Sequence, residues 1–420
     1  MQTDTLLISP RNIAWALFAI QLCLIPAVVA VRGYALGQLP TLPGNSVIAL
    51  SEILTVAGYG AFLVGMSTGV DQRGDDSRDS RPVSRSMSRL AILLGALGFS
   101  FRFSSLGSLL KYFSGDFTGN VVGTGGSASV VGALSTFFRP LIIPGLLLEW
   151  QSWHLRRRTS GRSTFILVCL ASVVVMSTYN YNRAAAAIPV IALVGSYSRC
   201  VRRVSFWRVA LLLLTLLMVG YLFGNVRRTI LATQGGRISV PASGVGKAPS
   251  FESQLQVYGQ APQFEAYVIL HGVDRSGLLY GSSILASALA PIPRIGSNFR
   301  GTTGTARYNV LIYGPIGAAD QILSYNAELY WNFGLVGVLL GFMILGALLD
   351  RIDRAYRRSS DVSWSYLWLF LGSWLSFLVI DSILVVSQVV VYFVLPTLIL
   401  LSYREVAVLP ITQASRDLPR

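Results

Sequence analysis

Residues 326–348 read NAELYWNFGLVGVLLGFMILGAL, a short polar opening followed by a long apolar run. An α-helix rises about 1.5 Å per residue, so about 20 apolar residues cross the roughly 30 Å hydrocarbon core of a bilayer. Runs of this kind, each about 18–22 residues long, follow one another from Ile13 to Leu401. The sequence therefore predicts an all-α polytopic membrane protein.

The composition agrees with that class. Of the 420 residues, 53% are hydrophobic and 13% are charged, against roughly 25% charged residues in soluble proteins. A formal charge of +15 would suggest a nucleic-acid partner in a soluble chain. Arginines in cytoplasmic loops account for most of it in a membrane protein, so we expect no nucleic acid. The cysteines and histidines lack the spacing of metal ligands, and we expect neither a metal nor another cofactor: Cys23, Cys169, Cys200, His154 and His271.

Arginine placement predicts the topology. We expect about ten spans, at about 13–32, 48–69, 90–110, 129–149, 164–181, 183–198, 208–225, 326–348, 363–380 and 384–402. The arginine-rich connections then all lie on the cytoplasmic side, together with both termini, as the positive-inside rule requires. Residues 1–225 hold spans 1–7 with a cytoplasmic linker at about 70–89, 226–325 form a large extracytoplasmic loop, 326–402 hold spans 8–10, and 403–420 form a cytoplasmic tail.

The large loop is cationic on the side of the membrane where basic residues are usually scarce. Between residues 227 and 325 stand seven arginines and one lysine against four acidic residues. Guanidinium groups bind phosphate oxygens in pairs, so this preference for arginine favours a diphosphate ligand. Contact with lipid head groups is the simpler alternative. The candidates for diphosphate binding, in the loop and at the outer ends of spans, are Arg183, Arg227, Arg228, Arg294, Arg300 and Arg307.

One apolar run inside the loop, Ile284–Ala290, is too short to cross a membrane. Pro291 and Pro293 follow it and would end a helix there. We expect an interfacial or re-entrant helix that leaves Arg294 at the membrane surface. Arg139, within the fourth predicted span, has two explanations: an interhelical contact or a functional site.

Carboxylates near the loop are the catalytic candidates. Glu328 stands at the outer start of the span 326–348. It either caps that helix and meets its dipole, or orients or deprotonates an acceptor hydroxyl. Asp381, between the last two spans, has the same two explanations, and His271 is either structural or catalytic. We therefore expect catalytic residues among Glu328, Asp320 and His271, and sugar-binding residues among Asn180, Asn182, Tyr280, Asn326 and Tyr330.

Three stretches carry a resemblance to a known family. They are Asn182-Arg183 at the opening of a span, Tyr280–Arg294 with Tyr-Gly-Ser-Ser and Pro-Ile-Pro-Arg, and Glu328–Gly337 with the pattern Glu-x-Tyr-x-Asn-Phe-Gly-x-x-Gly. With these stretches in this order around one large extracytoplasmic loop, the chain resembles the oligosaccharide repeat-unit polymerases, the Wzy type, of bacterial O-antigen and exopolysaccharide assembly.

The resemblance implies a GT-C-like membrane glycosyltransferase that needs no metal. Its donor and acceptor would both be oligosaccharides on undecaprenyl diphosphate, joined at the outer face of the bacterial inner membrane, with a chain-length regulator and a flippase as partners. Two alternatives stay open. A related O-antigen ligase would use His271. A flippase for the same glycans usually has paired halves and short loops, whereas this chain has a long loop and no internal repeat.

Overall fold

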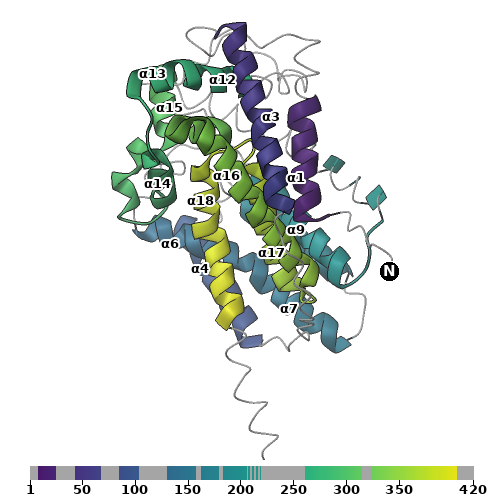
Figure 1. The fold of residues 1–420 in the computed structure, drawn as a ribbon. Helices are drawn as coiled ribbons and strands as arrows, with labels where there is room; N and C mark the ends of the chain where they lie inside the picture. The colour runs from purple at the N-terminus through teal and green to yellow at the C-terminus, as the bar shows by residue number, and fades with distance from the viewer. Residues whose placement is uncertain are drawn as a thin grey trace, which may run out of the picture. The chain divides into compact units, whose positions relative to one another are not determined.

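The computed structural model describes residues 8–24, 43–67, 85–103, 130–157, 162–178, 183–205, 207–208, 211, 214, 215, 218, 261–314 and 323–403. All regular elements within these ranges are helical (Figure 1). The chain divides into two compact units, and each is described by itself. Unit 1 comprises Met1–Gly74, Tyr221–Arg354 and Gly372–Gln388, and unit 2 comprises Asp75–Gly220, Ala355–Leu371 and Val389–Arg420.

Three helices form the core of unit 1: α1 (Pro10–Ala19), α3 (Asn45–Ser67) and α16 (Tyr325–Arg358). They run side by side (Figure 1) and bury one apolar cluster that includes Phe18 and Phe342. Small residues let α3 and α16 approach closely, because a Cβ on Gly65 would collide with the carbonyl of Met343. This contact fixes α16 along the length of α3.

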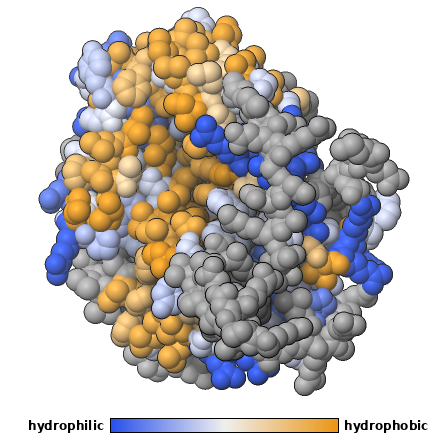
Figure 2. All heavy atoms as spheres, turned by 60° about the horizontal axis from the view of Figure 1, so that its bottom comes forward, coloured by the Kyte–Doolittle hydropathy of each residue, from blue (hydrophilic) through white to orange (hydrophobic). Residues whose placement is uncertain are grey.

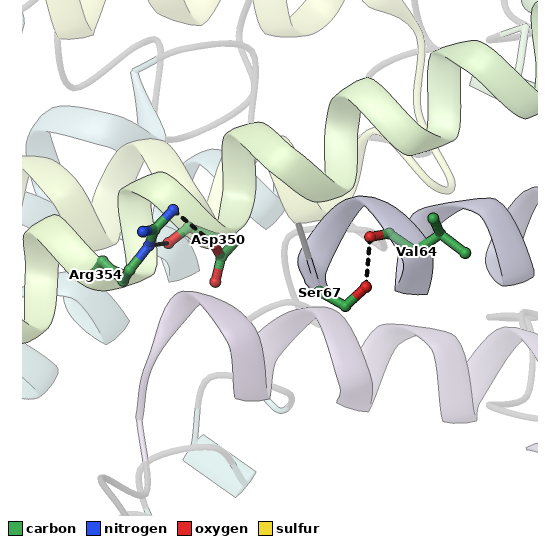
Figure 3. A network of polar contacts seen from close by, with 4 residues as sticks. All are labelled: Val64, Ser67, Asp350 and Arg354. Atoms are coloured by element: carbon green, nitrogen blue, oxygen red, sulfur yellow. Dashed lines mark hydrogen bonds and ion pairs between the residues drawn. The ribbon is translucent and has the colours of Figure 1, made fainter. Parts of the chain in front are cut away.

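The predicted cytoplasmic ends of α3 and α16 carry polar contacts (Figure 3). On α16, Arg354 pairs with Asp350 one turn earlier at 2.8 Å. On α3, the Ser67 hydroxyl donates to the Val64 carbonyl oxygen at 2.8 Å. The half-buried ion pair lies within one helix, where a pair at this spacing adds about 0.3–0.5 kcal/mol. Apolar packing rather than these contacts therefore holds the two helices together.

Helix α16 is broken near its start. Gly334 has φ 64° and ψ −152°, a conformation that costs almost any other residue free energy. The break leaves two carbonyl oxygens without their usual helical donors. The backbone N–H groups of Leu279 and Tyr280 donate to the carbonyls of Trp331 and Asn332, each at 3.0 Å. The predicted loop is thereby tied to the first turns of the span.

The described half of the predicted extracytoplasmic loop is folded and belongs to unit 1. It forms α12 (Ala261–Tyr267), a π-helix (Val268–Gly272), α13 (Val273–Ser276), α14 (Ser282–Leu289), short 3-10 turns at Gly296–Asn298 and Arg300–Thr302, and α15 (Gly304–Tyr313). Its own apolar cluster packs on the start of α16 through Trp331. The expected short helix at 284–290 is confirmed as α14, which ends before Pro291.

Unit 2 is built from α4 (Arg85–Arg102), α6 (Val130–Phe138), a 3-10 turn (Arg139–Leu141), α7 (Ile142–Arg157), α8 (Arg162–Ser177), α9 (Arg183–Cys200), and the first part of α17 (Val362–Phe377). Arg139 is buried there, and its Nη1 donates to the Thr178 hydroxyl at 3.0 Å. Its Nε donates to the Ser135 carbonyl at 3.3 Å. These contacts favour the interhelical explanation for Arg139.

In the described part of the chain, three helices are long and apolar enough to cross a membrane: Asn45–Ser67, Tyr325–Arg358 and Ile383–Tyr403. They coincide with the predicted spans 48–69, 326–348 and 384–402, and apolar residues cover much of the surface seen in Figure 2. The helix Ile383–Tyr403 begins as α18 (Ile383–Val389) and passes through a π-turn (Val390–Val394). The all-helical class is confirmed and these helices indicate a membrane protein.

The count of ten spans and the GT-C-like arrangement stay predictions. Helices at 85–102, 130–157 and 362–377 coincide with predicted spans, and the apolar segments Ser163–Met176 and Ala186–Cys200 are shorter than a full crossing. The predicted span 208–225 and the second half of 13–32 lie largely outside the described residues.

Candidate active site

Glu328 is the centre of the candidate site. It lies in the first turn of α16, and its side chain is fully buried, with 0% of its surface exposed. The Oε1 atom accepts hydrogen bonds from the hydroxyls of Ser287 at 3.0 Å and Ser283 at 3.5 Å. The Oε2 atom accepts from the backbone N–H of Ile383 at 3.3 Å. Three separate segments of unit 1 thus converge on one carboxylate.

Local helix geometry explains this convergence. Ser283 and Ser287 are four residues apart on α14, so they share one face of that helix. Ile383 is the first residue of α18, and its N–H has no partner within its own helix. A carboxylate at a helix N-terminus satisfies that donor and meets the positive end of the dipole. Within the described residues, Glu328 is held by neutral donors and by no ion pair.

Glu328 does not cap the helix to which it belongs. The cap of α16 is the Ser324 hydroxyl, which accepts from the Ala327 N–H at 3.3 Å. The carboxylate of Glu328 reaches the start of a different helix, at Ile383. The capping explanation therefore fits the structure for α18 rather than for α16.

Gly304, the first residue of α15, closes the remaining side of the carboxylate. A Cβ atom built on Gly304 would lie 2.5 Å from Glu328 Oε1, well inside van der Waals contact. Thr303 caps α15 through a 3.2 Å bond from the Ala306 N–H and fixes where the helix begins. Only a residue without a side chain lets the start of α15 lie this close to Glu328.

Asn332 extends the network by one turn of α16. Its side-chain Nδ2 donates to the Ser283 hydroxyl and to the Glu328 carbonyl, both at 2.7 Å. Asn332 is fully buried, and its Oδ1 atom has no hydrogen-bond partner in the structure. The Glu-x-Tyr-x-Asn spacing in the sequence already placed Asn332 below Glu328, yet sequence reasoning assigned it no role.

Strained, exposed residues flank α14: Tyr280 lies two residues before it, and Arg294 lies five residues after it. Tyr280 has φ 47° and Arg294 has φ 68°, both in the left-handed region that non-glycine residues rarely adopt. Tyr280 is 79% exposed, and Arg294 is exposed as well. Strain of this kind, about 1–3 kcal/mol per residue, persists where the surrounding structure enforces it and is common at ligand sites.

Arg300 and Arg307 lie on the segment between α14 and the body of α15, both half-buried. The Arg307 Nε donates to the Thr302 carbonyl at 3.1 Å, which holds its guanidinium near the 3-10 turn that contains Arg300. That turn packs against α14 and α15, the two helices that touch Glu328. The arginines of this segment therefore lie on the elements that enclose the carboxylate.

The other predicted site residues are not gathered around Glu328. Tyr330 packs against the apolar cluster of unit 1. His271 lies in the π-helix, where its ring contacts that of Tyr267 with centroids 4.5 Å apart. Asp381 accepts from the N–H of its neighbour Ser382 at 2.8 Å. Arg183 begins α9 in unit 2, and its side chain is outside the described residues, as are Asn180, Asn182, Arg227, Arg228 and Asp320.

Asn326 turns away from Glu328 toward a second buried carboxylate. Its Nδ2 donates to Glu265 Oε2 and to the Thr55 hydroxyl, both at 2.9 Å. Glu265 lies on α12, and only 3% of its surface is exposed. The sequence analysis assigned it no role. Nothing in the sequence near Glu265 could have revealed it, because its partners lie on α3 and at the start of α16.

No protein-family model, curated protein or solved structure matches this chain. In the described part of the chain, no group of three or more histidine, cysteine, aspartate or glutamate side chains is placed to hold a metal ion. Any functional assignment therefore depends on the chemistry of these buried carboxylates and the neighbouring arginines.

Proposed function

We propose that this chain is a glycosyltransferase that polymerises oligosaccharide repeat units carried on undecaprenyl diphosphate, at the outer face of the bacterial inner membrane. The observation that carries the proposal is the setting of Glu328: a fully buried carboxylate with neutral hydrogen-bond donors, enclosed by elements that bear exposed or half-buried arginines. A base and a cationic binding surface are the two parts that this transfer needs.

In the proposed reaction, Arg294, Arg300 and Arg307 bind the diphosphate of the donor. A hydroxyl of the acceptor sugar attacks the anomeric carbon of the donor chain and gives its proton to the Glu328 carboxylate. The bond between the anomeric carbon and the diphosphate oxygen breaks, and undecaprenyl diphosphate leaves with that electron pair. Fixed guanidinium groups stabilise the charge that develops on this leaving group, so the departing oxygen needs no proton.

The neutral donors around Glu328 give the carboxylate a fixed orientation. Ser287 and Ser283 hold Oε1, and the Ile383 N–H holds Oε2. Glu328 has no exposed surface in this structure, so an acceptor reaches it only after α14 or the start of α15 moves. The strained backbone at Tyr280 and Arg294 flanks α14 on its two sides, and a movement of this helix would begin there.

Lipid-linked oligosaccharide profiles of a deletion strain test this function. The proposal predicts that single repeat units accumulate on undecaprenyl diphosphate at the outer face, and that polymer is absent. Full-length polymer that lacks its final attachment would instead identify a ligase. Repeat units retained at the cytoplasmic face would identify a flippase.

A further inference from the structure

Asn332 is a buried polar residue to which the proposed reaction gives no part. It lies four residues after Glu328 on α16, so the two side chains share one face of that helix. None of its surface is exposed, and its Oδ1 atom has no hydrogen-bond partner. Burying an amide oxygen without a donor lowers the stability of a fold. Stability alone therefore does not explain an asparagine at this position.

The orientation of the Asn332 amide follows from its partners. The Nδ2 atom lies 2.7 Å from the Glu328 carbonyl oxygen and 2.7 Å from the Ser283 hydroxyl oxygen. A carbonyl oxygen can only accept a hydrogen bond, so the amide nitrogen and not the amide oxygen has to face it. The same nitrogen donates its second hydrogen to Ser283. Asn332 thus acts as a hydrogen-bond donor to both groups.

The Ser283 hydroxyl links Asn332 to the Glu328 carboxylate. A hydroxyl has one hydrogen to donate and accepts at its lone pairs. Because the Ser283 hydroxyl accepts from Asn332, its own hydrogen is left for Glu328 Oε1, at 3.5 Å. Without the amide, the hydroxyl is free to rotate and to present a lone pair to the carboxylate. Asn332 therefore makes Ser283 meet Glu328 as a donor.

The donors around Glu328 are divided unequally between its two oxygens. Oε1 accepts from the Ser287 and Ser283 hydroxyls, whereas Oε2 accepts from the N–H of Ile383. Each carboxylate oxygen has two lone pairs, so Oε2 keeps one for the proton of the acceptor hydroxyl. We propose that Asn332 is a positioning residue for Glu328, which acts through Ser283 to hold Oε1 and leaves Oε2 to take the proton. This role of Asn332 rests on the proposed function.

A purely structural role for Asn332 predicts a different result. The backbone carbonyl of Asn332 accepts from the Tyr280 N–H at 3.0 Å, which ties the segment before α14 to α16. That bond does not involve the amide and is available to any side chain at this position. Removing the amide should therefore disturb the carboxylate of Glu328 more than the attachment of α14.

Asn332→Leu removes the donor and keeps a similar volume. In the purified polymerisation assay we expect kcat to fall about 10–100-fold, because a small displacement of a catalytic group has an effect of that size. The KM values for donor and acceptor should stay within about threefold, since a fully buried side chain touches neither substrate. The Tm in detergent should fall by no more than about 3 °C, because the unpartnered amide oxygen is removed as well. If leucine prevents folding, Asn332→Ala removes the same donor without adding bulk.

Ser283→Ala supplies the matched test, because the effect of Asn332 passes through that hydroxyl. Ser283→Ala alone should lower kcat by a similar factor, and adding Asn332→Leu to it should lower kcat by less than about threefold more. Asn45→Leu makes the same substitution at an exposed position at the start of α3 and should leave kcat unchanged. Losses that multiply in the double variant would overturn the positioning role. A normal kcat in folded Asn332→Leu or Asn332→Ala would overturn it too.

Glu328→Gln in the same assay separates the role of Asn332 from the reaction on which it depends. Slow chain growth by Glu328→Gln beside a normal kcat for Asn332→Leu would overturn the positioning role alone. Normal chain growth by Glu328→Gln would overturn the base and the role of Asn332 together. Loss of kcat in both variants, with little further loss when Asn332→Leu is added to Ser283→Ala, is the result we expect.

Discussion

Glu328 shows how one residue acquires its setting from distant parts of the chain. The sequence left two explanations for it, a helix cap or a base. The structure assigns the cap of α16 to Ser324 and places the Glu328 carboxylate among Ser283, Ser287 and the N–H of Ile383. Ser283 and Ile383 lie 45 and 55 residues away from Glu328 in the sequence. A local sequence pattern therefore could not predict these contacts.

Replacing Gly304 tests how tightly this setting is built. A Cβ in Gly304→Ala would lie 2.5 Å from Glu328 Oε1, so the carboxylate or the start of α15 has to move. We expect a loss of about 1–3 kcal/mol in the free energy of unfolding, and a fall of about 10²-fold in polymerisation, because a shift of about 1 Å in a catalytic group costs that much.

Gly301→Ala is the matched control, since nothing lies within 4 Å of a Cβ built there. It should change the unfolding free energy by no more than about 0.5 kcal/mol. Unfolding in detergent and chain growth in vitro measure both variants. Equal unfolding free energies and equal rates of chain growth in the two variants would show that neither stability nor activity depends on the close approach of Gly304 to Glu328.

The sequence predicted some residues of the candidate site but not their backbone geometry or their distant partners. Glu328 and Asn332 stand in one motif on one helix, so their shared face follows from the sequence. Arg294 and Tyr280 were also named, but their left-handed backbone was not. Glu265 was not predicted, because its hydrogen-bond partners include Ser51, which is 214 residues away in the sequence.

Among the elements, the break in α16 is the feature that joins the loop to the membrane helix. The apolar run predicted one continuous span, because hydropathy does not reveal a change in backbone direction at a single glycine. Gly334 ends the helical path after two and a half turns, and the loop supplies the missing donors at Leu279 and Tyr280. Within the loop the sequence predicted only the short helix at 284–290, whereas the described half consists of several short helices with their own apolar core.

Gly334→Ala tests whether this break is required. Alanine is strained at φ 64° and ψ −152°, which costs about 1–3 kcal/mol, or else the helix straightens and the two carbonyls lose Leu279 and Tyr280. Either outcome should lower the Tm and move Glu328. Gly60→Ala on α3, where a Cβ would meet nothing within 4 Å, should instead be neutral or stabilising by up to about 1 kcal/mol.

Both variants are measured by thermal unfolding of the purified protein, with chain growth in vitro as the second readout. A Gly334→Ala protein with the Tm and activity of Gly60→Ala would contradict the view that the broken helix positions the site.

Across the whole molecule, composition and hydropathy were sufficient to predict an all-helical chain with membrane-spanning helices. Apolar runs of about 20 residues match a helical crossing, and a helix pairs its backbone polar groups within the run, as lipid requires. Three helices of spanning length coincide with predicted spans. The count of ten spans stays a prediction, because the apolar helices Ser163–Met176 and Ala186–Cys200 are shorter than a full crossing and other predicted spans lie partly outside the described residues.

Labelling of single cysteines tests the predicted orientation. In a chain without Cys23, Cys169 and Cys200, Arg275→Cys places a thiol at an exposed position of the predicted outer loop. A membrane-impermeant maleimide should label it in intact spheroplasts. Ser80→Cys, in the predicted cytoplasmic linker, should react only after the cells are lysed. The reverse pattern would place the arginine-bearing loop in the cytoplasm and exclude the proposed reaction.

The central claim, that Glu328 takes the proton of the acceptor hydroxyl, is tested most directly by Glu328→Gln in a purified polymerisation assay. Glutamine keeps the size of the side chain and one oxygen acceptor but cannot act as the base. Folding is checked by Tm, and Glu52→Gln on the exposed face of α3 controls for the loss of one negative charge. We predict chain growth slower by about 10²–10⁴-fold with a Tm close to that of the unmodified protein. Chain growth within a few-fold of normal in the folded Glu328→Gln protein would contradict the account.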